Sequence, residues 1–316
     1  MKLPDSIQVI ERGWLSSNNV LFFEGESATL VDSGYAGHAP QTVELVRVAL
    51  AGPRSGIAGR RTPVKLSRLI NTHSHSDHIG GNASLQANFG CSIVIPAGIE
   101  RMVREWDTDA LMLDAPKQRG DRFAHDAVIE ANSEFEMGGL SWQALPAPGH
   151  DMEALIFHCR EKRILISGDA LWQDGFGIIF GELMGRKDAL PATRGTLEMI
   201  GRLGVDVVIP GHGPAFDDFD AAMARALRRL ASFEADPTRM GRNAVRACFT
   251  FNLLDLERLR EDELPTYLKT VPFFDNVNQR MLGFSDAGFA EWLLGELLRS
   301  RSIELRDGWI LPTMAP

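Results

Sequence analysis

The feature that most constrains this chain is a run of metal-binding residue types between positions 71 and 81, Asn-Thr-His-Ser-His-Ser-Asp-His-Ile-Gly-Gly. It follows a largely apolar segment, Leu66 to Ile70, which predicts a buried strand. Imidazole nitrogens and carboxylate oxygens suit a borderline divalent ion such as zinc, and a loop leaving a strand can direct alternate side chains at one point. The run therefore indicates a metal site rather than a polar loop with surface histidines. Its potential ligands are His73, His75, Asp77 and His78.

Three more residues of ligand type stand where other apolar segments end, each directly after a glycine: His150, Asp169 and His212. Layered α/β proteins place their sites where the chain leaves the sheet, so we expect these residues to join the first four. The Gly80-Gly81 pair lets the backbone pass close to such a cluster before a helix begins.

The chain resembles the metallo-β-lactamase fold superfamily over about two thirds of its length. The resemblance lies in the His-x-His-x-Asp-His run followed by a later His, a later Asp and a final His, in that order. The resemblance implies an α/β fold, the αββα sandwich, and two divalent metal ions. Zinc is the expected metal, and iron or manganese would suit the same donors. The implied ligands are His73, His75 and His150 for one ion, Asp77, His78 and His212 for the other, and Asp169 as the bridge between them.

The resemblance also implies a hydrolytic mechanism. Two ions would share a hydroxide whose parent water has its pKa lowered from about 15.7 toward 7, which gives a nucleophile at neutral pH. Asp77 is then the expected catalytic residue, since its carboxylate can orient that hydroxide. Asp32, which ends an early strand, is expected to fix the ligands by hydrogen bonds. A turn-forming Asp before Ser33-Gly34 is the alternative for that position.

Hydrophobic periodicity predicts the remaining elements. The expected strands are 6–11, 19–24, 27–32, 91–96, 127–131, 140–145, 154–159 and 163–167, and the expected helices are 41–50, 98–106, 217–235, 243–254, 257–264, 267–271 and 286–301. Asp307-Gly308 between two alternating runs predicts a terminal hairpin. The charged segment 107–125 has no clear period, so it is either a lid over the metals or a surface connection.

The helices after residue 216 predict two domains. We expect a catalytic domain over 1–216 and a smaller, mainly helical, winged-helix-like C-terminal domain over 217–316, similar to that of β-lactamase-like protein 2, a ribonuclease of the superfamily. Lys/Arg and Asp/Glu nearly balance in this region, so packing, substrate enclosure or homodimerisation is its expected role, rather than nucleic-acid binding.

Composition limits the cellular compartment and the binding partners that are expected for this protein. Its formal net charge is −9, which disfavours electrostatic binding of nucleic acid, and the basic stretch Arg54–Arg61 is expected to be a solvated loop. Its three cysteines lack the spacing of a thiolate metal site and suit a reducing compartment. No apolar run approaches the ~18 residues of a membrane span, and the first residues do not resemble a secretion signal. The expectation is a cytoplasmic protein that binds no membrane.

Substrate choice is less constrained by the sequence. The segment 171–185, apolar and rich in glycine, follows Asp169 directly and is expected to line an acyl pocket, although its aromatic residues could instead close the core. The candidate pocket residues are Tyr35, Trp172, Phe176 and Phe180. A small-molecule ester, thioester or lactone is the favoured substrate, and a metal-dependent ribonuclease or phosphodiesterase is the alternative.

Three other branches of the superfamily fit this sequence less well. The acidic residue at Asp169 departs from the Cys or Ser of class B β-lactamases. Gly211-His212-Gly213-Pro214 departs from the Gly-His-Glu-Tyr of glyoxalase II, which disfavours a glutathione thioester. A non-enzymatic iron protein of the flavodiiron type lacks the expected flavodoxin-like domain.

Overall fold

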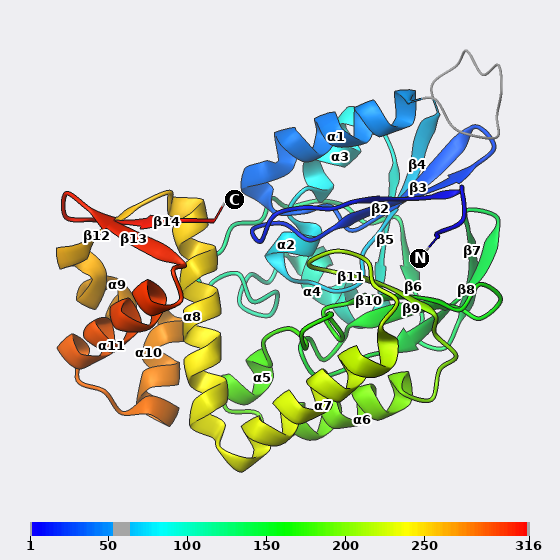
Figure 1. The fold of residues 1–316 in the computed structure, drawn as a ribbon. Helices are drawn as coiled ribbons and strands as arrows, with labels where there is room; N and C mark the ends of the chain where they lie inside the picture. Colours follow the sequence, from blue (N-terminus) through cyan, green and yellow to red (C-terminus); the bar gives the residue numbers. More distant parts are fainter. Residues whose placement is uncertain (1, 53–63, 315–316) are drawn as a thin grey trace.

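A computed structural model describes residues 2–52 and 64–314 of the chain, and Figure 1 shows its course. The predicted basic loop Arg54–Arg61 lies outside the described residues. Two β-sheets pack face to face, and helices cover the outer face of each sheet. The predicted αββα sandwich is confirmed, as is a mainly helical C-terminal region.

The first sheet has six strands in sequence order. Its first three strands are antiparallel neighbours, whereas the strands from β3 to β6 run parallel. Because parallel strands end at the same edge of a sheet, the loops after β3 and β4 lie close together. The strands are β1 (Ile7–Ile10), β2 (Asn19–Glu24), β3 (Ser27–Val31), β4 (Lys65–Ile70), β5 (Ser92–Pro96) and β6 (Ala127–Ile129).

The second sheet has five strands in the order β11-β10-β9-β8-β7, and only β10 and β11 run parallel. Its strands are β7 (Glu134–Met137), β8 (Leu140–Pro146), β9 (Leu155–Cys159), β10 (Ile164–Gly168) and β11 (Val207–Pro210). Strand β7 was not predicted from the sequence, because it is short and partly exposed and two of its four residues are glutamates.

The core lies in three layers. Phe22 of the first sheet and Trp142 and Phe157 of the second pack between the sheets. A second cluster joins the outer face of the first sheet to α1 (Ala39–Ala51), α3 (Asn82–Phe89) and α4 (Glu100–Glu105). A third joins the outer face of the second sheet to α5 (Phe180–Leu183), α6 (Ala189–Ile200) and α7 (Phe219–Ala235). Helix α6 was not predicted from the sequence.

The C-terminal region begins with the long helix α8 (Pro237–Leu256), drawn in yellow between the sandwich and the orange and red elements in Figure 1. Helices α9 (Leu264–Thr270), α10 (Pro272–Val277) and α11 (Asp286–Arg299) follow. A small sheet in the order β12-β14-β13 completes it, formed by β12 (Leu259–Arg260), β13 (Ile303–Arg306) and β14 (Trp309–Pro312). The predicted hairpin is confirmed, with φ of 52° at Asp307 and 76° at Gly308.

The predicted helix over 257–264 is wrong. Helix α8 ends before Glu257, which has a left-handed φ of 64°. Leu259 then pairs with Ile310 of β14, so tertiary pairing overrides the local helical pattern. The α7 helix packs against α6, and the third apolar cluster continues from the second sheet into α8 and α11. The division into domains at 216 and 217 stays a prediction.

Within the described residues, no helix is both long enough and apolar enough to cross a bilayer. The three cysteines, Cys91, Cys159 and Cys248, are buried and form no disulfide.

Candidate active site

The predicted ligands lie at one edge of the sandwich, where strands of both sheets end. His73 and His75 lie in the loop after β4, and Asp77 and His78 lie in the short helix α2 (Ser76–Ile79) that follows. The remaining three come from the second sheet: His150 from the loop between β8 and β9, Asp169 from the position after β10, and His212 from the loop after β11. The fold thus brings together residues that are up to 139 positions apart, from His73 to His212.

These seven side chains form two groups in which every potential ligand atom lies within 4.8 Å of the others. The first group is His73, His75 and His150, and the second is Asp77, His78, Asp169 and His212. Both are almost entirely buried, and each can hold one metal ion. The grouping matches the implied ligand sets, with Asp169 placed in the second group.

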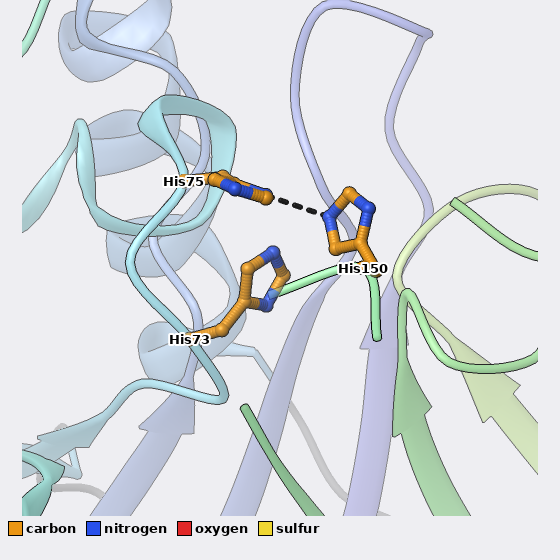
Figure 2. Close-up of side chains that lie close together, drawn as sticks. All are labelled: His73, His75 and His150. Carbon is orange, nitrogen blue, oxygen red and sulfur yellow. Dashed lines mark hydrogen bonds between the residues drawn. The ribbon is translucent and has the colours of Figure 1, made fainter. Parts of the chain in front are cut away.

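In the first group, three imidazole rings lie close together and roughly perpendicular to one another (Figure 2). His150 Nδ1 donates to the carbonyl oxygen of Ile178 at 2.6 Å, so His150 Nε2 carries no proton and has a lone pair that could bind an ion. This Nε2 atom lies 2.6 Å from His75 Nδ1. Burial and the neighbouring imidazoles hold the pKa of His73 well below its ordinary value and lower the pKa of His75 to about 4. These rings are therefore neutral, the form that binds a metal.

The second group combines carboxylates with imidazoles. His78 Nδ1 lies 2.8 Å from Asp32 Oδ2, and His212 Nε2 lies 2.8 Å from Asp77 Oδ2. Asp169 contacts both groups, since its Oδ1 lies 3.4 Å from His78 Nε2 and its Oδ2 lies 3.3 Å from His150 Nε2. This placement suits the bridging role that the resemblance implies.

The second group concentrates negative charge in a buried place. Burial opposes ionisation, but the nearby imidazoles, His78 above all, hold the pKa of Asp77 below its ordinary value and that of Asp169 well below it. Burial also opposes the charged form of His78, yet the carboxylates of Asp32, Asp169 and Asp77 raise its pKa well above the ordinary value. Carboxylates buried together need positive charge among them, which a protonated His78 supplies without an ion and a divalent ion would supply in place of that proton.

Two orphaned nitrogen atoms test whether metal ions fit. His73 Nε2 and His78 Nε2 are buried and have no hydrogen-bond partner among the described residues, although buried polar atoms of native proteins are nearly always paired. One lies in each group, among the donors that a divalent ion prefers. An ion in each group would satisfy both nitrogens and balance the carboxylates, so the residues fit two divalent metals.

Side chains behind the ligands hold them in place. Asp32 accepts hydrogen bonds from the backbone N–H of Thr72 and from its hydroxyl, both at 2.8 Å, in addition to the contact with His78. Asp151 accepts from the backbone N–H of Ser74 at 3.1 Å and from its hydroxyl at 2.7 Å, which joins the loops that carry His75 and His150. Asp32 thus contacts both the loop that carries His73 and the ring of His78, and its orienting role stays a prediction.

Gly80 and Gly81 pass directly against the loop after β3. A Cβ atom on Gly80 would lie 2.3 Å from the backbone nitrogen of Ala36, and one on Gly81 would lie 2.3 Å from the carbonyl oxygen of Ser33. Any larger residue would push α2, which carries Asp77 and His78, away from the first sheet.

A cavity of about 220 Å³ opens onto both groups. His75 and His150 of the first group and Asp77, Asp169 and His212 of the second lie in its wall, and most of the remaining lining is apolar. The other lining residues are Trp14, Met112, Gln118, Trp172, Phe176, Ile178, Phe180, Arg229, Asn243, Ala247, Cys248 and Phe251.

A comparison with protein families decides the affiliation of this chain. The model of the metallo-beta-lactamase superfamily matches residues 12–212, more than half of the sequence. The chain belongs to the metallo-beta-lactamase superfamily. The family predicted from the ligand pattern is thereby confirmed, and with it the broad class of metal-dependent hydrolase.

Curated relatives in this superfamily include hydrolases. The chain is 30% identical over 116 residues to a hydroxyacylglutathione hydrolase of Rhodopseudomonas palustris (strain HaA2), and this match covers 37% of the chain and 38% of the relative. It is 26% identical over 152 residues to a probable metallo-hydrolase of Bacillus subtilis (strain 168), covering 47% and 69%. The chain thus spans well under two thirds of the length of the hydroxyacylglutathione hydrolases it matches.

Solved structures share the superfamily fold. A metallo-beta-lactamase family protein of Thermus thermophilus superposes with a TM-score of 0.57 at 18% identity, covering 98% of this chain and all of the other. A metallo-beta-lactamase of Pontibacter korlensis gives a TM-score of 0.52 at 17% identity, covering 73% and 97%.

The superfamily pattern did not identify the whole pocket. Trp172, Phe176 and Phe180 line the cavity as expected, but Tyr35 does not. The Tyr35 side chain is fully buried, and its hydroxyl donates to Asp255 Oδ2 on α8 at 3.1 Å and accepts from the backbone N–H of Arg119 at 3.1 Å. Its position three residues after Asp32 gave no information about the direction of its side chain.

Sequence reasoning also missed part of the cavity wall. Trp14, Arg229 and four residues of α8 belong to it, and no motif marks them because only tertiary packing brings these segments together. The charged segment 107–125 contributes Met112 and Gln118 to the cavity wall. The indole N–H of Trp172 donates to Asp169 Oδ1 at 3.1 Å, a further contact that the sequence did not reveal.

Proposed function

We propose that this protein is a dinuclear metal-dependent hydrolase of a small-molecule ester, thioester or lactone. The observation that carries the proposal is the shared cavity, in which two buried groups of metal-binding side chains face an apolar wall. Ligand pockets typically combine an apolar lining with a few convergent polar groups. Such a cavity suits a substrate with an apolar portion next to the bond that is cleaved.

The side chains have distinct roles in this proposal. His73, His75 and His150 would hold one ion, Asp77, His78 and His212 the other, and Asp169 would contact both. Divalent ions bound there would supply a nucleophilic water near neutral pH and polarise the carbonyl oxygen of the substrate. Zinc suits this mixture of nitrogen and oxygen donors, and iron or manganese would also fit.

Residues of the chain would position the water and the substrate. Asp77 lies in the cavity wall, and its Oδ2 contacts His212. Its carboxylate is placed to accept a hydrogen bond from the attacking water and so orient it. Trp172, Phe176 and Phe180 exclude bulk water from the same space and would contact the acyl group.

The comparisons support carbonyl chemistry. Several relatives are named hydroxyacylglutathione hydrolases, which act on a thioester. Because the matches with these hydrolases cover about half of each relative or less, glutathione itself is not carried over, and a thioester or ester of other composition is the proposed substrate. The cavity lining includes one cationic side chain among the described residues, Arg229, rather than the basic groove that a nuclease would require.

A matched panel of chromogenic substrates tests the proposal. The metal-loaded protein would be assayed with a carboxylic ester, a thioester, a cephalosporin and a phosphodiester that each give a colour change on cleavage, and with a lactone whose ring opening is followed by proton release to a pH indicator. Turnover confined to the ester, thioester or lactone supports the proposal. Selective cleavage of the phosphodiester would replace it with a nuclease, and selective cleavage of the cephalosporin would replace it with a β-lactamase.

A further inference from the structure

Arg229 of α7 is a cation in the wall of the cavity, together with His75, Asp77 and Asp169. Its guanidinium carbon lies 5.3 Å from the ring centroid of Phe176 and 5.5 Å from that of Phe233. Gly175 makes room for it, since a Cβ atom there would lie 2.7 Å from Arg229 Nη1. Two aromatic rings and a glycine therefore hold the guanidinium in one place.

No carboxylate of the described chain lies within ion-pair distance of Arg229. Among the described residues its side chain makes one hydrogen bond, a long one of 3.5 Å from Nη1 to the carbonyl oxygen of Asp174. By contrast, Arg225, one helical turn earlier, is paired with Asp218 at 2.7 Å and with Asp174 at 3.3 Å. The described part of the chain thus leaves the guanidinium of Arg229 without an anion.

The surroundings of Arg229 make an unpaired positive charge at this position energetically unfavourable. The residue is half-buried, and burial together with the nearby charge of Arg246 lowers its pKa. A partly desolvated charge without a partner destabilises the protein unless something else supplies the opposite charge. Because Arg229 lines the cavity beside the proposed metal ligands, an anionic group of a bound substrate could supply that charge.

We propose that Arg229 binds a carboxylate group of the substrate. The substrate is then an ester or thioester that carries a carboxylate, with an apolar segment between this carboxylate and the bond that is cleaved. This inference rests on the proposed function and specifies its substrate. The planar guanidinium can donate two parallel hydrogen bonds to a carboxylate, a geometry that lysine cannot reproduce. The aromatic residues between Arg229 and the ligands would contact the apolar segment.

Binding of inhibitors tests the inference without requiring turnover. Linear dicarboxylates from succinate to suberate would be titrated calorimetrically into the metal-loaded full chain, each beside its monoamide. One carboxylate of either compound can occupy the metal centre, so only the second end differs. We expect the best dicarboxylate to bind about 10- to 100-fold more tightly than its monoamide, the range of a charged hydrogen-bonded pair.

Variants assign that preference to Arg229. Arg229→Met keeps an apolar side chain against Phe176 and should remove the preference, whereas Arg229→Lys should retain part of it. Arg228→Met, which removes an exposed arginine of the same helix, should leave it unchanged. Equal binding of dicarboxylate and monoamide to the wild-type protein, or an Arg229→Met variant that weakens both alike, would overturn the inference.

The same titration separates this inference from the proposed function. If the preference depends on Arg229 but no ester, thioester or lactone is hydrolysed, the carboxylate site stands and the proposed function fails. If such substrates are hydrolysed but Arg229→Met changes neither the inhibitor preference nor the KM ratio of carboxylate-bearing and methyl-capped substrates, the proposed function stands and the inference fails.

Discussion

The Asp32→Asn variant tests how the chain prepares a metal ligand. Asp32 Oδ1 accepts from the backbone N–H of Thr72, and Oδ2 accepts from the Thr72 hydroxyl and from His78 Nδ1, each at 2.8 Å. With its proton on Nδ1, the His78 ring presents a bare Nε2, the orphaned atom that is proposed to bind an ion. The Asp32 carboxylate thereby selects the tautomer of the ligand.

Asparagine cannot satisfy this network in either orientation. If its oxygen faces the Thr72 N–H, its NH2 group faces His78, and Nδ1 can then accept only when the proton moves to Nε2 and blocks the ligand atom. If its oxygen faces His78, two N–H donors meet at Thr72. Asp32 has a left-handed φ of 57°, which asparagine tolerates, so the backbone should be retained.

The expected loss follows from the hydrogen bond. A hydrogen bond to a charged group contributes about 1.5–3 kcal/mol, and about 1.4 kcal/mol corresponds to a tenfold change in affinity. Asp32→Asn should therefore weaken the ion of the second group about 10- to 100-fold, in line with the usual effect of removing such a partner. Competition with a chromophoric chelator, combined with elemental analysis, measures this affinity.

Asp255→Asn is the matched control. Asp255 is a partly buried carboxylate that pairs with Tyr35 and Arg119 and contacts no proposed ligand among the described residues, so its variant should bind metal like the wild type. Unchanged metal affinity in Asp32→Asn, or an equal loss in both variants, would refute the argument about the tautomer.

Three other predictions concern different parts of the structure. Asp169→Ala should reduce the metal content toward one ion per chain by elemental analysis, and retention of two ions would contradict its placement between the groups. Phe180→Ala should cost about 3–5 kcal/mol in denaturant unfolding and shift turnover toward longer acyl groups, because its ring packs 4.9 Å from that of His75 in the cavity wall; an unchanged acyl preference would remove Phe180 from the pocket. The two tyrosines, Tyr35 and Tyr267, should ionise near pH 12, since burial raises the pKa of each to about 12. The folded pKa lies above the ordinary value of about 10, so the contribution of the neutral tyrosines to stability should be constant below pH 10 and fall as the pH rises toward 12. Tyrosinate absorbance that develops at pH 10 in the folded protein would contradict this.

The metal-binding residues could be predicted from the sequence because their information is local. Each has a ligand side chain at the end of an apolar segment, and the carboxyl ends of neighbouring strands meet at one edge of a sandwich. His73 and His78 illustrate this, since a single loop and turn place them in different groups. The order of the ligands then indicated the superfamily and the αββα fold.

The pocket could not be predicted in the same way because its wall depends on packing between distant segments. Arg229 and Cys248 lie on helices whose apolar faces indicate burial but not the partner they pack against. Tyr35 shows the reverse case, because its position beside the site in sequence does not bring its hydroxyl into the cavity. The pairing of Leu259 with Ile310 likewise overrides a helical pattern through a contact 51 positions away.

The metal content of the purified full chain tests the central claim most directly. Elemental analysis of the protein, loaded with excess zinc and then freed of unbound metal by gel filtration, should give two ions per chain. It should give about one ion per chain for a variant that replaces Asp77 and His212 of the second group with alanine. Two ions in the wild type and about one in this variant would support two buried sites side by side. A wild-type protein that holds no divalent metal, or a variant that still holds two ions, would contradict the account.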